Sequence, residues 1–102
     1  DCDVDLFDDD VLRDPYPTYA ELRRLGPVVR MTRHGFLAVA RYTDVRAVLN
    51  DQEHFVSGRG VGFNEEFNHV RSSSIIASDE PRHGMLRDVL GERLGPRALK
   101  GV

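Results

Sequence analysis

Residues 78–94 constrain the fold most, because they read as a helix with positive groups on its inward face. Asp79 can cap this helix, and Pro81 suits its first turn, where a missing N–H costs nothing. Four residues recur at i, i+4, i+7 and i+11 on one face: His83, Arg87, Leu90 and Leu94. An unpaired buried charge is costly, and nothing nearby in sequence supplies an anionic partner. We therefore expect a bound anion against His83 and Arg87; the alternative is a structural helix whose inward His83 is satisfied by backbone.

The residues before this helix predict a small α+β fold with one hairpin. A helix is expected over 15–25 with Asp14 as its cap, because Gly26-Pro27 is the order that ends helices. Two β-rich runs, 28–32 and 36–41, flank a loop of hairpin length that contains His34, and a second helix is expected over 43–50. Residues 1–13 form an acidic arm with a few apolar anchors.

Helical periodicity fails between residues 55 and 77, which predicts a long loop over 57–77. Loops of this length inside a compact domain are often functional. Gly58, Gly60 and Gly62 superficially suggest a phosphate cradle, but neither GxGxxG nor GK[ST] is present, which disfavours a nucleotide loop. The chain thus divides into four parts: the arm (1–13), a helix–hairpin–helix part (14–56), the loop (57–77), and the last helix with its following turn (78–102).

Composition excludes several classes of function. A formal net charge of −3 gives no global attraction to nucleic acid or anionic lipid. One cysteine excludes an intrachain disulfide, and no apolar run approaches the ~20 residues that span a bilayer. His34, His54 and His69 lack the spacing of a zinc site, so no protein-bound metal is expected. The acidic start is unlike a signal peptide, and we expect a cytoplasmic protein.

The segment D-E-P-R-H-G-M-L-R at 79–87 resembles the helix C motif of bacterial cytochromes P450, D-P-P-x-H-x-x-x-R. Residues 94–97, L-G-P-R, resemble the F-T-P-R that closes that helix, and residues 14–23 resemble the D-P-Y-P-x-x-x-x-L-R opening of helix A. Glu80 and Leu94 depart from the usual Pro and Phe. The resemblance covers roughly residues 5–102. It implies an N-terminal fragment of the cytochrome P450 fold: helix A, a short β hairpin, helix B, a long B–C loop and helix C.

The resemblance implies that His83 and Arg87 bind a haem propionate. The parent would be a haem-thiolate monooxygenase that inserts one oxygen atom from O2 into a small organic substrate, with electrons from a ferredoxin-type donor. The family's F-x-x-G-x-x-x-C-x-G ligand loop is absent from these residues, and Cys2 lies among aspartates without such glycines. We therefore expect no catalytic residue in this chain, no activity from the chain alone, and absent or weak haem binding.

A second resemblance concerns the loop. Residues 57–62 and 71–76 resemble a bacterial P450 subfamily that oxidises para-substituted aromatic carboxylates and shows S-R-G-V-G and R-P-P-S-L-I there. It implies that Arg71 and Ser74 hold the substrate carboxylate. The B–C loop of the family covers the distal haem face, and six residues are expected near substrate: Val61, Phe63, Arg71, Ser74, Ile75 and Ile76. Ser72-Ser73 replaces the stiff Pro-Pro, and an exposed, solvated Arg71 is the alternative.

Two non-enzymatic interpretations stay open. One is a small α+β module that self-associates through surface that a missing domain would cover. The other is a ligand-binding module that holds an organic acid through Arg71 and the neighbouring serines. A helix-turn-helix DNA reader is disfavoured, because the chain is acidic and its second helix is short.

Overall fold

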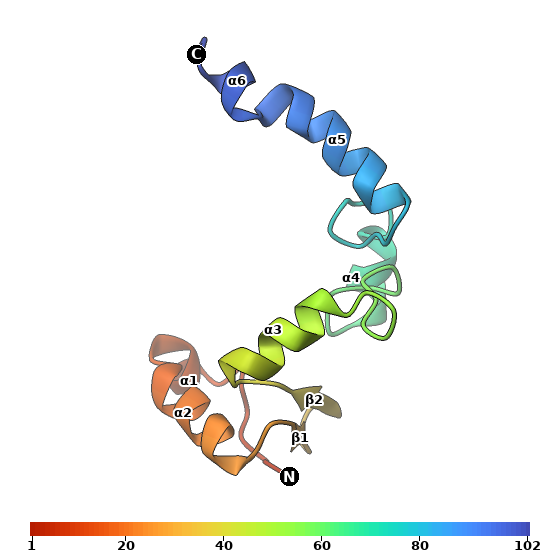
Figure 1. The fold of residues 1–102 in the computed structure, drawn as a ribbon. Coiled ribbons are helices and arrows are strands. Elements are labelled where there is room, and N and C mark those ends of the chain that lie inside the picture. The colour runs from red at the N-terminus through yellow and green to blue at the C-terminus, as the bar shows by residue number, and fades with distance from the viewer. The chain divides into compact units, whose positions relative to one another are not determined.

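A computed structural model describes all 102 residues, which fall into two compact units, residues 1–51 and 52–102 (Figure 1). The first unit contains α1 (Asp9–Arg13), α2 (Tyr16–Leu25), β1 (Val29–Met31), β2 (Phe36–Ala38) and α3 (Tyr42–Asn50). The second contains α4 (Glu65–Val70), α5 (Arg82–Leu94) and α6 (Pro96–Leu99). The predicted α+β architecture with a short antiparallel hairpin is confirmed.

The core of the first unit lies between α2 and the hairpin. Leu22 on α2 and two residues of β1, Val29 and Met31, are buried, and Met31 is fully inaccessible. Alternation along β1 sends Val29 and Met31 inward and leaves Arg30 exposed. Antiparallel pairing of β1 with β2 sets Met31 opposite Phe36, which packs against the same cluster.

The N-terminal arm, predicted as an acidic segment with a few apolar anchors, pairs with β1 of the hairpin. Cys2 pairs with Met31 in a parallel bridge: the Cys2 N–H donates to the Arg30 carbonyl at 2.7 Å. His34 lies in the hairpin loop as expected, and its Nε2 accepts from the Leu6 N–H at 3.1 Å. The arm therefore lies against β1 and the hairpin loop through these backbone contacts. Residues 9–13 of the arm also form α1, which the Asp8 side chain caps.

Of the two predicted ends of α2, the first is wrong and the second is confirmed. Asp14 does not cap α2; it ends α1, and α2 starts after Pro15 without any side-chain cap. At the other end Gly26, at φ 157°, terminates α2 directly before Pro27, as predicted. The predicted helix over 43–50 is present as α3, which begins one residue earlier.

Part of the predicted 57–77 loop is helical. α4 occupies its middle, with Asn64 as the N-cap whose side chain accepts from the Phe67 N–H at 2.7 Å. Glu65 and Glu66 in the first turn complement the helix dipole. Six residues are too few for an apolar period to show, which is why the pattern predicted only loop.

The glycines of this loop serve packing against α4. Asn68 on α4 accepts from the Gly62 N–H at 2.7 Å and donates to the Gly62 carbonyl at 3.1 Å. A Cβ on Gly60, which has φ +119°, would lie 2.3 Å from Asn68 Cγ. The Gly60 N–H donates to the Ser57 carbonyl at 3.0 Å. The Gly60 and Gly62 N–H groups that a phosphate cradle would use are thus engaged within the loop, which further disfavours the nucleotide interpretation.

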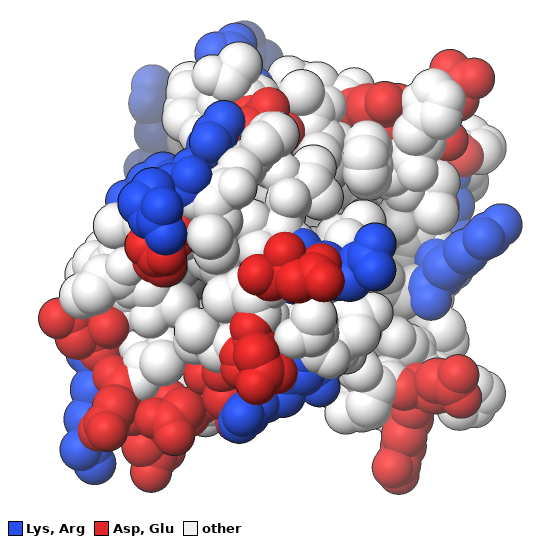
Figure 2. Space-filling view, turned by 90° about the horizontal axis from the view of Figure 1, so that it is seen from below, with Lys and Arg blue, Asp and Glu red and all other residues white.

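The helices and surface add two observations. None of the helices is both long and apolar enough to cross a bilayer; the longest, α5, has 13 residues. Both acidic and basic side chains lie on the face shown in Figure 2.

We expect Leu22→Ala to lower the free energy of unfolding of the first unit by about 2–5 kcal/mol, because it leaves a cavity beside Met31. All three tyrosines, Tyr16, Tyr19 and Tyr42, lie in this unit, so tyrosine fluorescence during urea unfolding reports on it alone. Leu37→Ala is the matched control, because Leu37 is 65% exposed. Equal losses for both variants would contradict this core.

Two glycine substitutions in the second unit should act with opposite signs. Gly60→Ala should destabilise by about 1 kcal/mol or more, because it combines positive φ with the Asn68 clash. Gly91→Ala should raise the helicity of α5 and stabilise it by about 0.5–1 kcal/mol, since nothing lies near the added methyl. Far-UV circular dichroism with amide hydrogen exchange measures both effects. Unchanged stability in Gly60→Ala would refute the close packing against α4.

Candidate functional site

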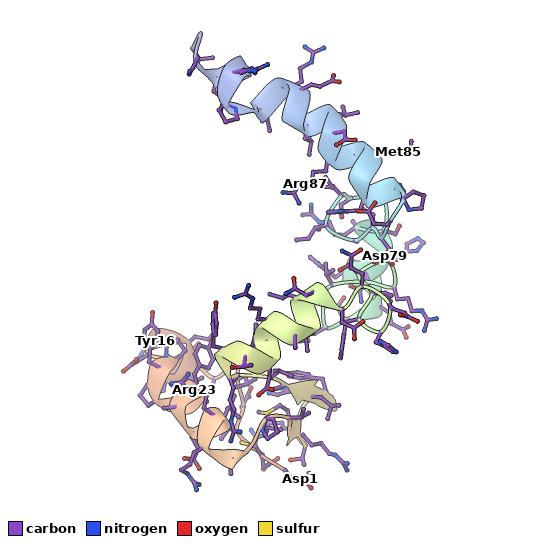
Figure 3. The ribbon with its side chains drawn as sticks, in the orientation of Figure 1. Asp1, Tyr16, Arg23, Asp79, Met85 and Arg87 are labelled. Carbon is purple, nitrogen blue, oxygen red and sulfur yellow. The ribbon has the colours of Figure 1, made fainter.

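The candidate site is built on α5 and the turn that precedes it. α5 begins after Pro81 without a side-chain cap, so the predicted capping role of Asp79 is wrong. The Asp79 carboxylate instead accepts from the Ser57 N–H at 2.7 Å and the Gly58 N–H at 2.8 Å. Glu80 serves the first turn of α5 instead, since its Oε2 accepts from the Gly84 N–H at 3.1 Å. Figure 3 labels Asp79 before α5 and Arg87 on it.

His83 has an anionic neighbour that the sequence analysis overlooked. Its Nδ1 lies 3.4 Å from Glu80 Oε1, three residues earlier in the chain. The His83 side chain is about one-third exposed, at 34%. Contact with Glu80 engages Nδ1 and leaves Nε2 as the ring nitrogen that can meet a ligand. The signal was available, because the spacing of Glu80 and His83 brings side chains together at a helix start.

Arg87 lies one turn after His83 and has no carboxylate within ion-pair distance. α5 contains no buried residue, so the predicted inward stripe is exposed in this chain: Leu90 is 43% and Leu94 61% accessible. An open hollow of about 830 Å³ adjoins the helix. Its lining consists of Arg87, Asp88, Leu90, Gly91, Glu92, Leu94 and Gly95. A guanidinium beside apolar surface and open volume is suited to bind a ligand with both an anionic and an apolar part.

One turn of the loop brings Arg71 and Ser74 together. The Ser74 hydroxyl donates to the Arg71 carbonyl at 2.7 Å, and the Arg71 guanidinium lies over the Phe67 ring with Cζ 5.8 Å from its centroid. The Ser72 hydroxyl donates to the His69 carbonyl at 2.8 Å. The Ser72 hydroxyl, bonded to backbone, therefore constrains this turn at a position where the resembling subfamily has proline. The guanidinium itself is exposed and has no carboxylate partner.

Arg82 connects this turn to α5, which the sequence did not indicate. Its Nη2 donates to the Ser73 carbonyl at 3.1 Å. The first residue of α5 thereby holds the segment that carries Arg71 and Ser74. Tertiary placement alone makes this contact, because nine residues separate Arg82 from Ser73.

The remaining predicted substrate residues lie in the same unit. Val61, Phe63 and Ile76 are exposed and Ile75 is half-buried. A hollow of about 290 Å³ between the glycine segment and α4 is lined by other residues: Gly58, Arg59, Gly60, Glu65, Asn68, His69 and Ser72. Substrate contact by the six predicted residues stays a prediction.

No family model matches the chain. Two curated relatives align over 100 residues, 95% of the chain. Cytochrome P450 CYP199A2 of Rhodopseudomonas palustris is 42% identical, with 24% of its length covered. The putative cytochrome P450 123 of Mycobacterium tuberculosis is 30% identical, with 25% covered. The chain thus spans about a quarter of the length of these relatives.

Solved structures agree with the curated relatives. The structure of cytochrome P450 CYP109Q5 from Chondromyces apiculatus matches with a TM-score of 0.77 and 36% identity, over 98% of this chain and 27% of that one. The crystal structure of CalO2 matches with a TM-score of 0.71 and 39% identity, over 94% of this chain and 25% of that one. By sequence and by fold, the chain belongs to the bacterial cytochromes P450 and corresponds to their N-terminal portion.

Proposed function

We propose that this chain supplies the propionate-binding helix and part of the substrate loop of a cytoplasmic haem-thiolate monooxygenase. The parent enzyme would insert one oxygen atom from O2 into a small organic substrate. The observation that carries the proposal is Arg87, an exposed guanidinium without a carboxylate partner, one helical turn from His83 and beside the hollow along α5. Membership of the P450 family supports haem as the group that brings the anion.

The donor set fits a haem propionate. Arg87 offers a planar fork of N–H donors, and His83 offers Nε2 while its Nδ1 faces Glu80. Charge-assisted hydrogen bonds from these groups would neutralise and orient a carboxylate. Bound haem would supply the oxygen-activating chemistry. In this proposal His83 and Arg87 position the cofactor and form no bond with substrate, and none of these 102 residues is catalytic.

For the substrate we propose an aromatic carboxylate held by Arg71 and Ser74. The support is the exposed Arg71 guanidinium beside the aromatic ring of Phe67, in the same turn as Ser74. An aromatic ring next to a guanidinium complements a ligand that is itself flat and anionic. The Ser74 hydroxyl would exchange its bond to the Arg71 carbonyl for one to the ligand.

Three further parts of the proposal concern partners and activity. The electron donor would be of ferredoxin type. The chain by itself would be inactive and would bind haem weakly or not at all, because the family's cysteine loop is not among these residues.

The alternative function is a non-catalytic, self-associating module, and exposed apolar residues of α5, Met85 and Val89 among them, favour it. Sedimentation of the chain against concentration tests that alternative.

Arg87→Ala in the parent enzyme should speed haem loss roughly ten- to hundred-fold, as expected from removing a charge-assisted hydrogen bond worth about 1.5–3 kcal/mol. Transfer of haem to excess apomyoglobin measures the rate. Arg93→Ala is the matched control on another face of α5, and it should leave the rate unchanged. Unaltered haem loss in Arg87→Ala would refute the propionate assignment.

Arg71→Gln should weaken binding of benzoate-type ligands to the parent roughly ten-fold or more, because it removes the charge that pairs with the carboxylate. The methyl ester of the same ligand has no charge, so its affinity should barely change. Ligand-induced shifts of the haem absorption spectrum measure both affinities. Equal losses for acid and ester would assign Arg71 to general loop structure.

A further inference from the structure

We propose that Asp79 is a positioning residue that bonds the start of the 57–77 loop to the residues leading into α5. We call this contact the clip, and residues 57 and 58 the loop base. The clip would hold the segment carrying Arg71 and Ser74 in register with the helix carrying His83 and Arg87. This inference rests on the proposed function for its consequence in the parent enzyme. The clip itself rests on contacts within the second unit.

Both oxygens of the Asp79 carboxylate are used, each by a different backbone group. Oδ1 accepts from the Ser57 N–H at 2.7 Å, and Oδ2 accepts from the Gly58 N–H at 2.8 Å. These contacts join residues 22 and 21 positions apart, so they close the whole loop at its base. Two successive N–H groups aimed at one carboxylate form an anion-binding nest, here filled by the chain itself.

The surroundings of Asp79 are shaped for this contact. A Cβ on Gly58 would lie 2.3 Å from Asp79 Oδ2 and 3.2 Å from its Cγ, so only glycine permits the approach. Ala77 and Ser78, directly before Asp79, are buried, and the Ser78 hydroxyl donates to the Ile75 carbonyl at 2.6 Å. The Asp79 carbonyl accepts from the His83 N–H at 2.9 Å. One residue thus bonds the loop base through its side chain and α5 through its backbone.

The clip and the Arg82–Ser73 bond hold the loop at two points. Asp79 fixes residues 57 and 58, and Arg82 fixes the turn just before Ser74. Release of either point would widen the range of positions open to Arg71 and Ser74, because an unclosed chain regains conformational entropy. The expected effect is on ligand affinity, and haem retention through Arg87 should be spared.

Amide hydrogen exchange on this chain tests the clip directly. Asp79→Ala should speed exchange at Ser57 and Gly58 about ten-fold or more, and should also speed it at Ser74, whose N–H bonds the Arg71 carbonyl. Asp79→Asn retains one acceptor oxygen and should release only one of the two N–H groups at the base. Asp88→Ala removes an exposed aspartate of α5 and should change none of these rates. Unchanged exchange at Ser57 and Gly58 in Asp79→Ala overturns the clip.

Gly58→Ala approaches the same contact from the loop side and covers the case in which Asp79→Ala unfolds the unit. Gly58→Ala alone should speed exchange at Ser57, because its Cβ displaces the Asp79 carboxylate, and unchanged exchange there overturns the clip. Where Asp79→Ala stays folded and the clip is the shared cause, the double variant Gly58→Ala/Asp79→Ala should exchange no faster than Asp79→Ala. Additive effects overturn the assignment. Acceleration confined to Ser57 and Gly58, with Ser74 unchanged, overturns the positioning role.

In the parent enzyme Asp79→Asn should weaken ligand affinity about three- to ten-fold at unchanged haem retention, a split that general unfolding cannot produce. Unchanged affinity together with a released loop base overturns the coupling. A parent that binds no haem refutes the proposed function, and the exchange results on Ser57, Gly58 and Ser74 still decide the clip.

Discussion

The second unit depends on the requirement that backbone polar groups find partners where little apolar surface is buried. Only Ala77 and Ser78 are buried in residues 52–102, so side chains that bond to backbone replace a core as the organising element. Asp79 engages the loop base, Asn68 engages Gly62, and Glu80 engages Gly84. Each of these contacts fixes a segment that sequence pattern alone would leave open.

In the first unit, by contrast, the burial of a few apolar side chains sets the register of the strands. A one-residue slip of β1 would expose Met31 and bury Arg30, which the cost of an unpaired buried charge forbids. The acidic arm then adds to this frame through Cys2 and the acceptor nitrogen of His34. Apolar pattern therefore decides the hairpin, and polar contacts decide the arm.

This difference, apolar burial in the first unit and side chain–backbone bonds in the second, explains which predictions succeeded. Gly26-Pro27 ends α2 and the hairpin forms where expected, because each follows from backbone preferences of adjacent residues. Asp14 and Asp79 were assigned as the N-caps of α2 and α5, and neither caps that helix; Asp14 is instead the C-cap of α1. A carboxylate that can cap a helix can equally accept from distant N–H groups, and for Asp79 those lie 21 and 22 residues away. α1 and α4 are too short to leave a periodic signal.

The sequence by itself determined the family and the order of α2, the hairpin, α3 and α5, and it placed His83 and Arg87 one turn apart, since helical spacing is a local property. It also singled out Arg71 and Ser74, whose contact lies within one turn. Only the tertiary structure decided that Glu80 faces His83, that Arg82 holds Ser73, and that Asp79 closes the glycine-rich loop. Such contacts depend on where the chain returns in space, because a side chain bonds to whichever donor or acceptor the fold brings within about 3 Å.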